Sequence, residues 1–172
     1  QIIGGWVSDR FGAKRTLVVC GIIWASATVL TGLAGGFVSL IIARVLLGLG
    51  EGAPFPAATA AMSRWIPKEK RGFAQGITHA FARLGNALAP AAMIAVMATY
   101  GWRESFYVCA AISFTWVAIW ALVFTEQPKD QPRISQQELD VLPPPKAKNK
   151  HPLAWGRLFK RMAPVTIVYF CY

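Results

Sequence analysis

Four ionisable side chains lie inside stretches of this sequence that are otherwise apolar: Arg44, Glu51, His79 and Arg83. A charge at the centre of a bilayer costs about 2.5–3.5 kcal/mol on insertion scales, so such residues usually face a bundle interior or a wet cavity. Seven residues separate Arg44 from Glu51, which places them on nearly one helix face, about 10 Å apart. Room for water or a ligand is left beside them by small residues, namely Gly48, Gly50 and Gly52. A helix face that carries both charges beside such room is expected to line a cavity that water or a substrate can enter.

A second polar face lies on the next apolar stretch. Its members recur at intervals of four, four, three and four residues, which places them on one side of a helix: Gln75, His79, Arg83, Asn86 and Pro90. We expect this stripe to line the same cavity, where His79 could exchange a proton and Arg83 could bind a carboxylate through two hydrogen bonds. The alternative is that these charges form structural ion pairs that only hold the bundle together.

The elements that would position these residues are membrane-spanning helices. Charged residues make up 15% of the 172 residues, whereas soluble domains carry about a quarter. The apolar residues gather into runs that approach the roughly 20 residues needed to cross a bilayer. We identify four such runs: Leu17–Leu33, Phe37–Met62, Phe73–Ala98 and Ser105–Phe124. The predicted fold class is therefore an all-α, polytopic transmembrane bundle. Pro54 and Pro56 should bend or break the second run just past Glu51.

The net charge of +10 is distributed unevenly among the loops. Basic residues concentrate before the first run, between the second and third runs, and after Phe124, while the other loops hold only Arg103. Alternation of this kind is the positive-inside pattern. It predicts a multi-pass protein of the plasma (inner) membrane, surrounded by lipid, with the basic loops in the cytoplasm. The charge sets orientation, so we expect no nucleic-acid partner.

The composition changes after Thr125. We assign residues 1–126 to part of an N-terminal transmembrane bundle, 127–161 to a cytoplasmic linker rich in proline, and 162–172 to the start of a further helix. Within the linker, Ser135 and Glu138 have the spacing of a capping box, which predicts a short helix. No metal-ligand cluster, phosphate loop or nucleophile–base pair is visible, so we expect no enzyme, no metal and no cofactor.

The sharpest local pattern runs from Gly5 to Arg15 between two apolar helices. Its defining residues are Gly5, Asp9, Arg10, Gly12, Lys14 and Arg15. This segment resembles the signature loop between helices two and three of the major facilitator superfamily. Asp9 could accept hydrogen bonds from the positive end of a helix. The resemblance implies two six-helix bundles in a protein that is monomeric when complete, of which this chain covers late helix two to early helix seven. It also implies that Asp9 and Arg10 tie the bundles together, and Arg64 could join them.

The stretch Arg44–Pro56 resembles helix four of the anion:cation symporter family within that superfamily. That family includes permeases for galactonate, glucarate, hexuronates and aromatic acids. The resemblance implies secondary active transport of a small organic anion by symport, with Glu51 in proton coupling and Arg44 in charge balance or anion binding. The coupling ion would be a proton or sodium. The alternatives are a drug or sugar carrier working by antiport, or a truncated fragment without activity.

Overall fold

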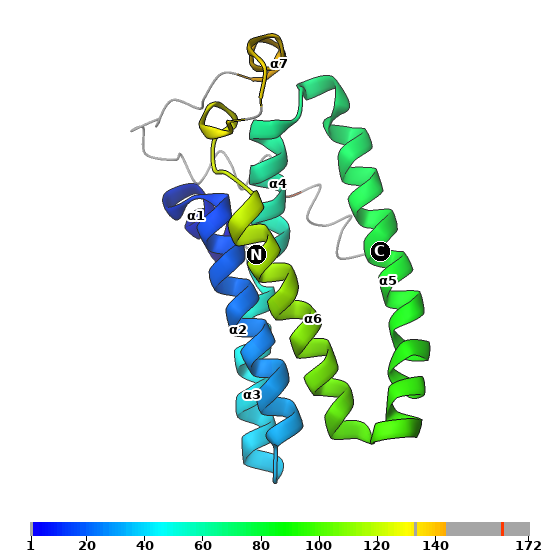
Figure 1. Ribbon diagram of the computed structural model, residues 1–172. Coiled ribbons are helices and arrows are strands. Elements are labelled where there is room, and N and C mark those ends of the chain that lie inside the picture. Colours follow the sequence, from blue (N-terminus) through cyan, green and yellow to red (C-terminus); the bar gives the residue numbers. More distant parts are fainter. Residues whose placement is uncertain (1, 133, 144–162, 164–172) are drawn as a thin grey trace.

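The computed structural model describes residues 2–132, 134–143 and 163, and all of its regular elements are helical (Figure 1). The helices are α1 (Ile2–Phe11), α2 (Ala13–Leu33), α3 (Phe37–Glu51), α4 (Pro54–Trp65), α5 (Arg71–Tyr100), α6 (Trp102–Val123) and α7 (Gln136–Val141), with 3₁₀ turns η1 (Lys68–Lys70) and η2 (Pro128–Asp130). The predicted all-α class is confirmed. The linker end at residue 161 and the further helix at 162–172 lie outside the described residues, apart from residue 163.

Four helical stretches are long and apolar enough to cross a membrane: Ala13–Leu33, Phe37–Trp65, Lys68–Tyr100 and Trp102–Val123. They contain the four runs expected from the sequence. The second stretch is two helices, because α3 ends at Glu51 and α4 begins at Pro54, with Gly52 and Ala53 between them. Pro54 then occupies the first position of α4, where a proline needs no hydrogen bond from its nitrogen. The predicted break is confirmed.

Large apolar side chains cover the outside of the bundle. Phe37 is 77% exposed and Leu122 is 85% exposed, and many similar residues accompany them. Exposure on this scale suits a lipid environment or contact with further helices, and together with the four long apolar helices it identifies a multi-pass membrane protein.

The core lies where α2 packs between α3 and α6, and it is built from small residues. A Cβ added to Gly50 would lie 2.8 Å from the backbone nitrogen of Trp24, and one added to Gly21 would lie 2.4 Å from Val117. Alanines at positions 13, 25, 27, 43 and 57 are fully buried. Such residues let helix backbones approach closely, which is how helices associate in lipid. Helix α5 stands apart from α2 and α3 (Figure 1), and none of its residues is buried.

The described parts of the three basic loop regions lie at one end of the bundle (Figure 1). Trp65 at the end of α4 donates its indole N–H to the carbonyl of Thr125 beyond α6, over 3.2 Å. The turns that join α2 to α3 and α5 to α6 lie at the opposite end (Figure 1). The loop alternation read from the sequence is therefore matched by the fold, and we call this end the basic end.

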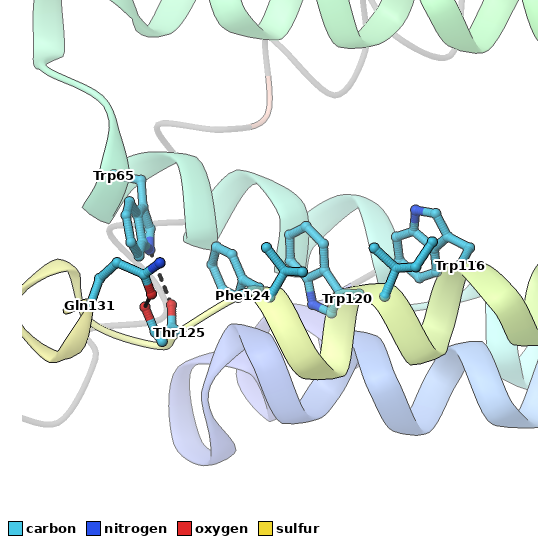
Figure 2. Close-up of a pocket in the computed structure, with 8 residues that line it drawn as sticks. Trp65, Trp116, Trp120, Phe124, Thr125 and Gln131 are labelled. Carbon is cyan, nitrogen blue, oxygen red and sulfur yellow. Dashed lines mark hydrogen bonds between the residues drawn. The ribbon is translucent and has the colours of Figure 1, made fainter. Parts of the chain in front are cut away.

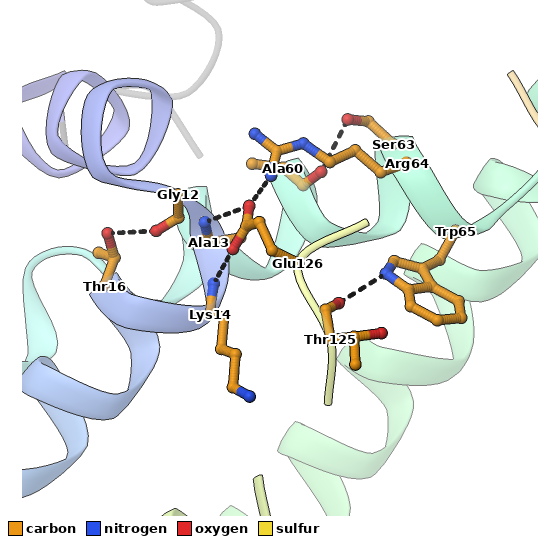
Figure 3. Close-up of polar contacts among 10 residues, drawn as sticks. All are labelled: Gly12, Ala13, Lys14, Thr16, Ala60, Ser63, Arg64, Trp65, Thr125 and Glu126. Carbon is orange, nitrogen blue, oxygen red and sulfur yellow. Dashed lines mark hydrogen bonds and ion pairs between the residues drawn. The ribbon is translucent and has the colours of Figure 1, made fainter. Parts of the chain in front are cut away.

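A single carboxylate joins three helices at the basic end. Glu126, just past α6, accepts hydrogen bonds from the backbone N–H groups of Ala13 (3.0 Å) and Lys14 (2.8 Å), which open α2 (Figure 3). These N–H groups have no partner within their own helix, and the helix dipole favours a negative charge there. Arg64 of α4 forms an ion pair with the same carboxylate. Glu126 thus caps α2 while linking α4 and α6.

Gly12 makes this cap possible for two reasons. Its φ of 94° lies in the left-handed region that residues with a Cβ rarely adopt. A Cβ at this position would also lie 2.8 Å from the Glu126 carboxylate. The glycine of the signature loop therefore serves the cap as well as the turn.

We predict that Glu126→Ala lowers the stability of the protein by about 0.5–2 kcal/mol, the usual range for a lost helix cap. Glu126→Gln keeps a hydrogen-bond acceptor and should lose less. Thermal unfolding of the purified protein in detergent measures both. The matched control is Glu69→Ala, because Glu69 is exposed at the same end. Equal melting temperatures for Glu126→Ala and Glu69→Ala would contradict the role of Glu126.

Candidate functional site

Arg44 and Glu51 lie on one side of α3, and Glu51 is its last residue. Ala43 and Gly50, one position earlier in each case, are buried against the rest of the bundle. Arg44 and Glu51 therefore lie about 100° around the helix from the packed face. Both side chains are exposed. They point away from the packed core, as expected for residues that line a cavity or meet further helices.

The helix break beside Glu51 is held tightly against α1. A Cβ on Gly4 would lie 2.6 Å from the Cα of Ala53 and 2.9 Å from the carbonyl oxygen of Gly52. Contact this close is possible only because Gly4 lacks a side chain. The backbone that follows Glu51 therefore has a fixed position relative to α1 and α2.

The polar stripe of α5 is turned toward α4. The imidazole of His79 stacks on the ring of Phe55, with centroids 5.9 Å apart and planes 13° from parallel. The amide nitrogen of Gln75 lies 3.3 Å from Nε2 of His79. Arg83 and Asn86 continue the same helix face by one and two turns. Both are exposed, so this face lies open beside the α3–α4 break.

No ion pair joins Arg44, Glu51 and Arg83 within residues 2–132, 134–143 and 163. The structural alternative, in which Arg83 pairs with an acidic residue on a further helix, concerns helices beyond the described residues and stays a prediction. What the arrangement provides is two guanidinium groups and one carboxylate on the uncovered faces of α3 and α5, with an imidazole between α4 and α5. That set can neutralise an anion and can exchange a proton.

The signature loop has partly the arrangement expected from the sequence. The close approach of α1 to the start of α4 depends on Gly4 and not on Gly5, because a Cβ at Gly5 would sit 3.9 Å from Pro56, an ordinary van der Waals contact. The Arg10 guanidinium lies over the Trp6 ring, 5.3 Å from its centroid. Asp9 is exposed and has no hydrogen bond or ion pair within the described part of the chain. Lys14 and Arg15 belong to the first turn of α2.

Glu126 is the residue of the basic end that sequence reasoning missed. Glu126, and not Asp9, caps the N-terminus of α2, and Arg64, which was expected to join Asp9 and Arg10, pairs with Glu126 (Figure 3). The available signal was an acid that directly follows an apolar run at an end where the charges are otherwise mostly basic. The partner of that acid could not be read from this signal.

An aromatic cleft of about 280 Å³ lies between α4 and α6 (Figure 2). Two neighbouring pairs of rings stack, with centroids 5.6 Å apart for Trp116–Trp120 and 4.2 Å apart for Trp120–Phe124. The Trp65 and Phe124 rings are tilted by 43°, with centroids 5.6 Å apart. Thr125 and Gln131 close one end, and their side chains are joined by a hydrogen bond. The lining contains no ionisable group, so this cleft cannot neutralise an anion. The candidate site remains on α3 and α5.

Comparison with known proteins supports the assignment made from the signature loop. The family model of the Major Facilitator Superfamily matches residues 1–172 of this chain. A probable sulfoacetate transporter of Cupriavidus necator is 46% identical over 100% of this chain and 41% of its own length. The hexuronate transporter of Escherichia coli K12 is 31% identical over 83% of this chain and 33% of its own length. The galacturonate transporter of Dickeya chrysanthemi is 32% identical over 83% of this chain and 41% of its own length. This chain thus spans about two fifths or less of these relatives.

The signature segment lies between two helices and contains the positive-φ glycine Gly12. The family match covers this segment and the rest of the chain, residues 1–172. The chain belongs to the Major Facilitator Superfamily.

Proposed function

We propose that this chain is part of a secondary active transporter that carries a small organic anion by alternating access in symport with a proton. The observation that carries the proposal is the direction of the α5 stripe. The His79–Phe55 stack turns that stripe toward the break that follows Glu51, so Arg83 faces the same region as the carboxylate. Arg44 adds a second guanidinium two turns along α3 from Glu51.

Glu51 and the anion would compete for the arginines. An ionised Glu51 can pair with Arg44 or Arg83, and a protonated Glu51 leaves them free for the anion. Proton binding and anion binding then strengthen each other, which is the linkage that symport requires. An inward proton also draws on the membrane potential, worth about 2.3 kcal/mol per charge per 100 mV.

The relatives guide the choice of substrate class. They are named for the transport of sulfoacetate, hexuronate and galacturonate, and these molecules share a carboxylate. We therefore propose a sugar acid or another small carboxylate as substrate. We also propose a plasma-membrane location with the basic end in the cytoplasm, and a complete carrier that works as a monomer without a cofactor.

Glu51→Gln should separate transport from coupling. It mimics the protonated carboxylate, so it should abolish accumulation driven by a pH gradient and preserve counterflow exchange of the anion. Proteoliposomes that hold the complete carrier, with labelled anion, measure both activities. Glu104→Gln is the matched control, since Glu104 begins α6 at the far end of the bundle. Full gradient-driven uptake by Glu51→Gln would reject proton coupling through Glu51.

Arg44→Ala and Arg83→Ala should each weaken anion binding, because each removes a charged hydrogen-bond donor. A loss of about tenfold or more in affinity is expected, since hydrogen bonds to charged groups contribute about 1.5–3 kcal/mol. Uptake kinetics for carboxylates and for neutral sugars measure the effect. Lys68→Ala, in the exposed 3₁₀ turn, is the control. Uptake of neutral sugars or hydrophobic cations, with no dependence on the arginines, would favour the sugar or drug carrier instead.

The orientation predicts which single cysteines react from outside. In a carrier whose own cysteines are replaced, Lys68→Cys should be protected from a membrane-impermeant thiol reagent in intact cells. Gly35→Cys should react, because that turn lies at the opposite end and has open space around it. Labelling of Lys68→Cys from outside, with Gly35→Cys protected, would reverse the topology.

A further inference from the structure

Phe55 is the aromatic residue that connects the helix break with the polar stripe. It lies in the first turn of α4, and 50% of its surface is exposed. Its ring is not needed for the packing of α4 against α1, which uses the small residues Ala53 and Gly4. The ring instead meets the imidazole of His79 on α5.

The backbone that carries Phe55 has little freedom to move. On one side of the break Gly50 contacts the backbone of α2, with only 2.8 Å between a Cβ at Gly50 and the nitrogen of Trp24. On the other side Ala53 contacts α1, and Ala57, one turn into α4, is fully buried. The Phe55 ring is therefore a fixed reference point on the packed part of the bundle.

Helix α5 is constrained far less. None of its 30 residues is buried. Met93 of α5 contacts α6 through its flexible thioether, whose sulfur lies 3.2 Å from the thiol sulfur of Cys109. The first residue of α5, Arg71, donates hydrogen bonds to the backbone carbonyls of Ser63 (2.7 Å) and Ile66 (3.1 Å) at the end of α4. Between Arg71 and Met93, the rotation of α5 about its axis depends on side-chain contacts, and one residue corresponds to 100° of rotation.

The Phe55–His79 stack lies at a depth where it can set that angle. Phe55 is ten residues from the end of α4 at Trp65, and His79 is eight residues from the start of α5 at Arg71. These separations correspond to about 15 Å and 12 Å from the basic end. Glu51 precedes Phe55 across the break, and Arg83 follows His79 by one turn on the same face. Both lie beyond the stack, on the side away from the basic end.

From this geometry we infer that Phe55 is a positioning residue of the anion site. Its ring, by stacking on His79, sets the rotation of α5 and presents Arg83 toward Glu51. The amide of Gln75 supports the arrangement, because it lies 3.3 Å from Nε2 of His79 and so holds the plane of the imidazole. This inference rests on the proposed function and adds a residue that has no charge and no expected contact with the anion.

The test is a set of variants in the complete carrier. Phe55→Leu keeps an apolar side chain of similar bulk and removes the aromatic face. It should raise KM for the anion by about three- to tenfold, since aromatic pairs contribute roughly 0.5–1.5 kcal/mol, while the maximal rate stays within about twofold. Phe55→Trp keeps a stacking surface and should retain the normal KM. Uptake kinetics in proteoliposomes provide both parameters.

A double-variant cycle distinguishes positioning from space filling. In a His79→Ala background the stack is already lost, so Phe55→Leu should cause no further rise in KM. If Phe55 only fills space, its effect should add to that of His79→Ala. The matched control is Phe81→Leu, because Phe81 lies about 200° around α5 from His79 and is 68% exposed. It should leave KM unchanged.

The outcomes separate this inference from the proposed function. If the unmodified carrier transports no organic anion, the proposed function fails. If it transports an anion and Phe55→Leu leaves KM unchanged, or the two variants are additive, the positioning role of Phe55 is overturned while the function stands.

Discussion

Close backbone contact along α2 is the constraint on which the rest of this structure depends. Within a bilayer, helices gain little from hydrophobic burial against one another, so van der Waals contact between small residues holds them together. Gly21 meets Val117 of α6, and Gly50 of α3 meets the backbone at Trp24. These contacts fix the place where α3 ends. They therefore also fix Glu51 and the prolines that start α4, before any polar side chain is considered.

The basic end adds an electrostatic contact to this packing. Glu126 satisfies two N–H groups of α2 and pairs with Arg64, so the ends of α2, α4 and α6 are joined by one carboxylate. Helix α5, which carries Arg83 and His79, is joined to the end of α4 through Arg71, whose guanidinium donates hydrogen bonds to the carbonyls of Ser63 and Ile66. The packed helices thus hold the carboxylate of the candidate site, and the least packed helix holds the groups opposite it.

The sequence was sufficient for the features that local physics determines. Apolar length predicted the four spans, Pro54 and Pro56 predicted the break, and Ser135 with Glu138 predicted the cap of α7, which the two hydrogen bonds between these residues confirm. It was insufficient where the contact is long-range. Glu126 meets Ala13 across 113 positions, and nothing near either residue indicates the other. The Phe55–His79 stack was missed for the same reason, because the phase of α5 relative to α4 is a tertiary property. Asp9 was expected at a helix N-terminus on charge alone, and Glu126 could occupy that place because the end of α6 lies beside it.

Under the proposed function, the charges on α3 and α5 make a further argument for coupling. Arg44 and Arg83 contribute two positive charges and an ionised Glu51 contributes one negative charge, so the three groups together carry one net positive charge. Protonation of Glu51 raises that to two. An empty site with ionised Glu51 is then closer to neutral than an empty site with protonated Glu51, and a low-dielectric cavity disfavours the more charged form. The anion restores the balance after protonation. With a monovalent anion, the filled and protonated site carries the same single positive charge as the empty and deprotonated site, and these are the two forms that a symporter must carry across the membrane. The filled and deprotonated site would be neutral, so net charge does not disfavour it; it is disfavoured because ionised Glu51 and the anion compete for Arg44 and Arg83.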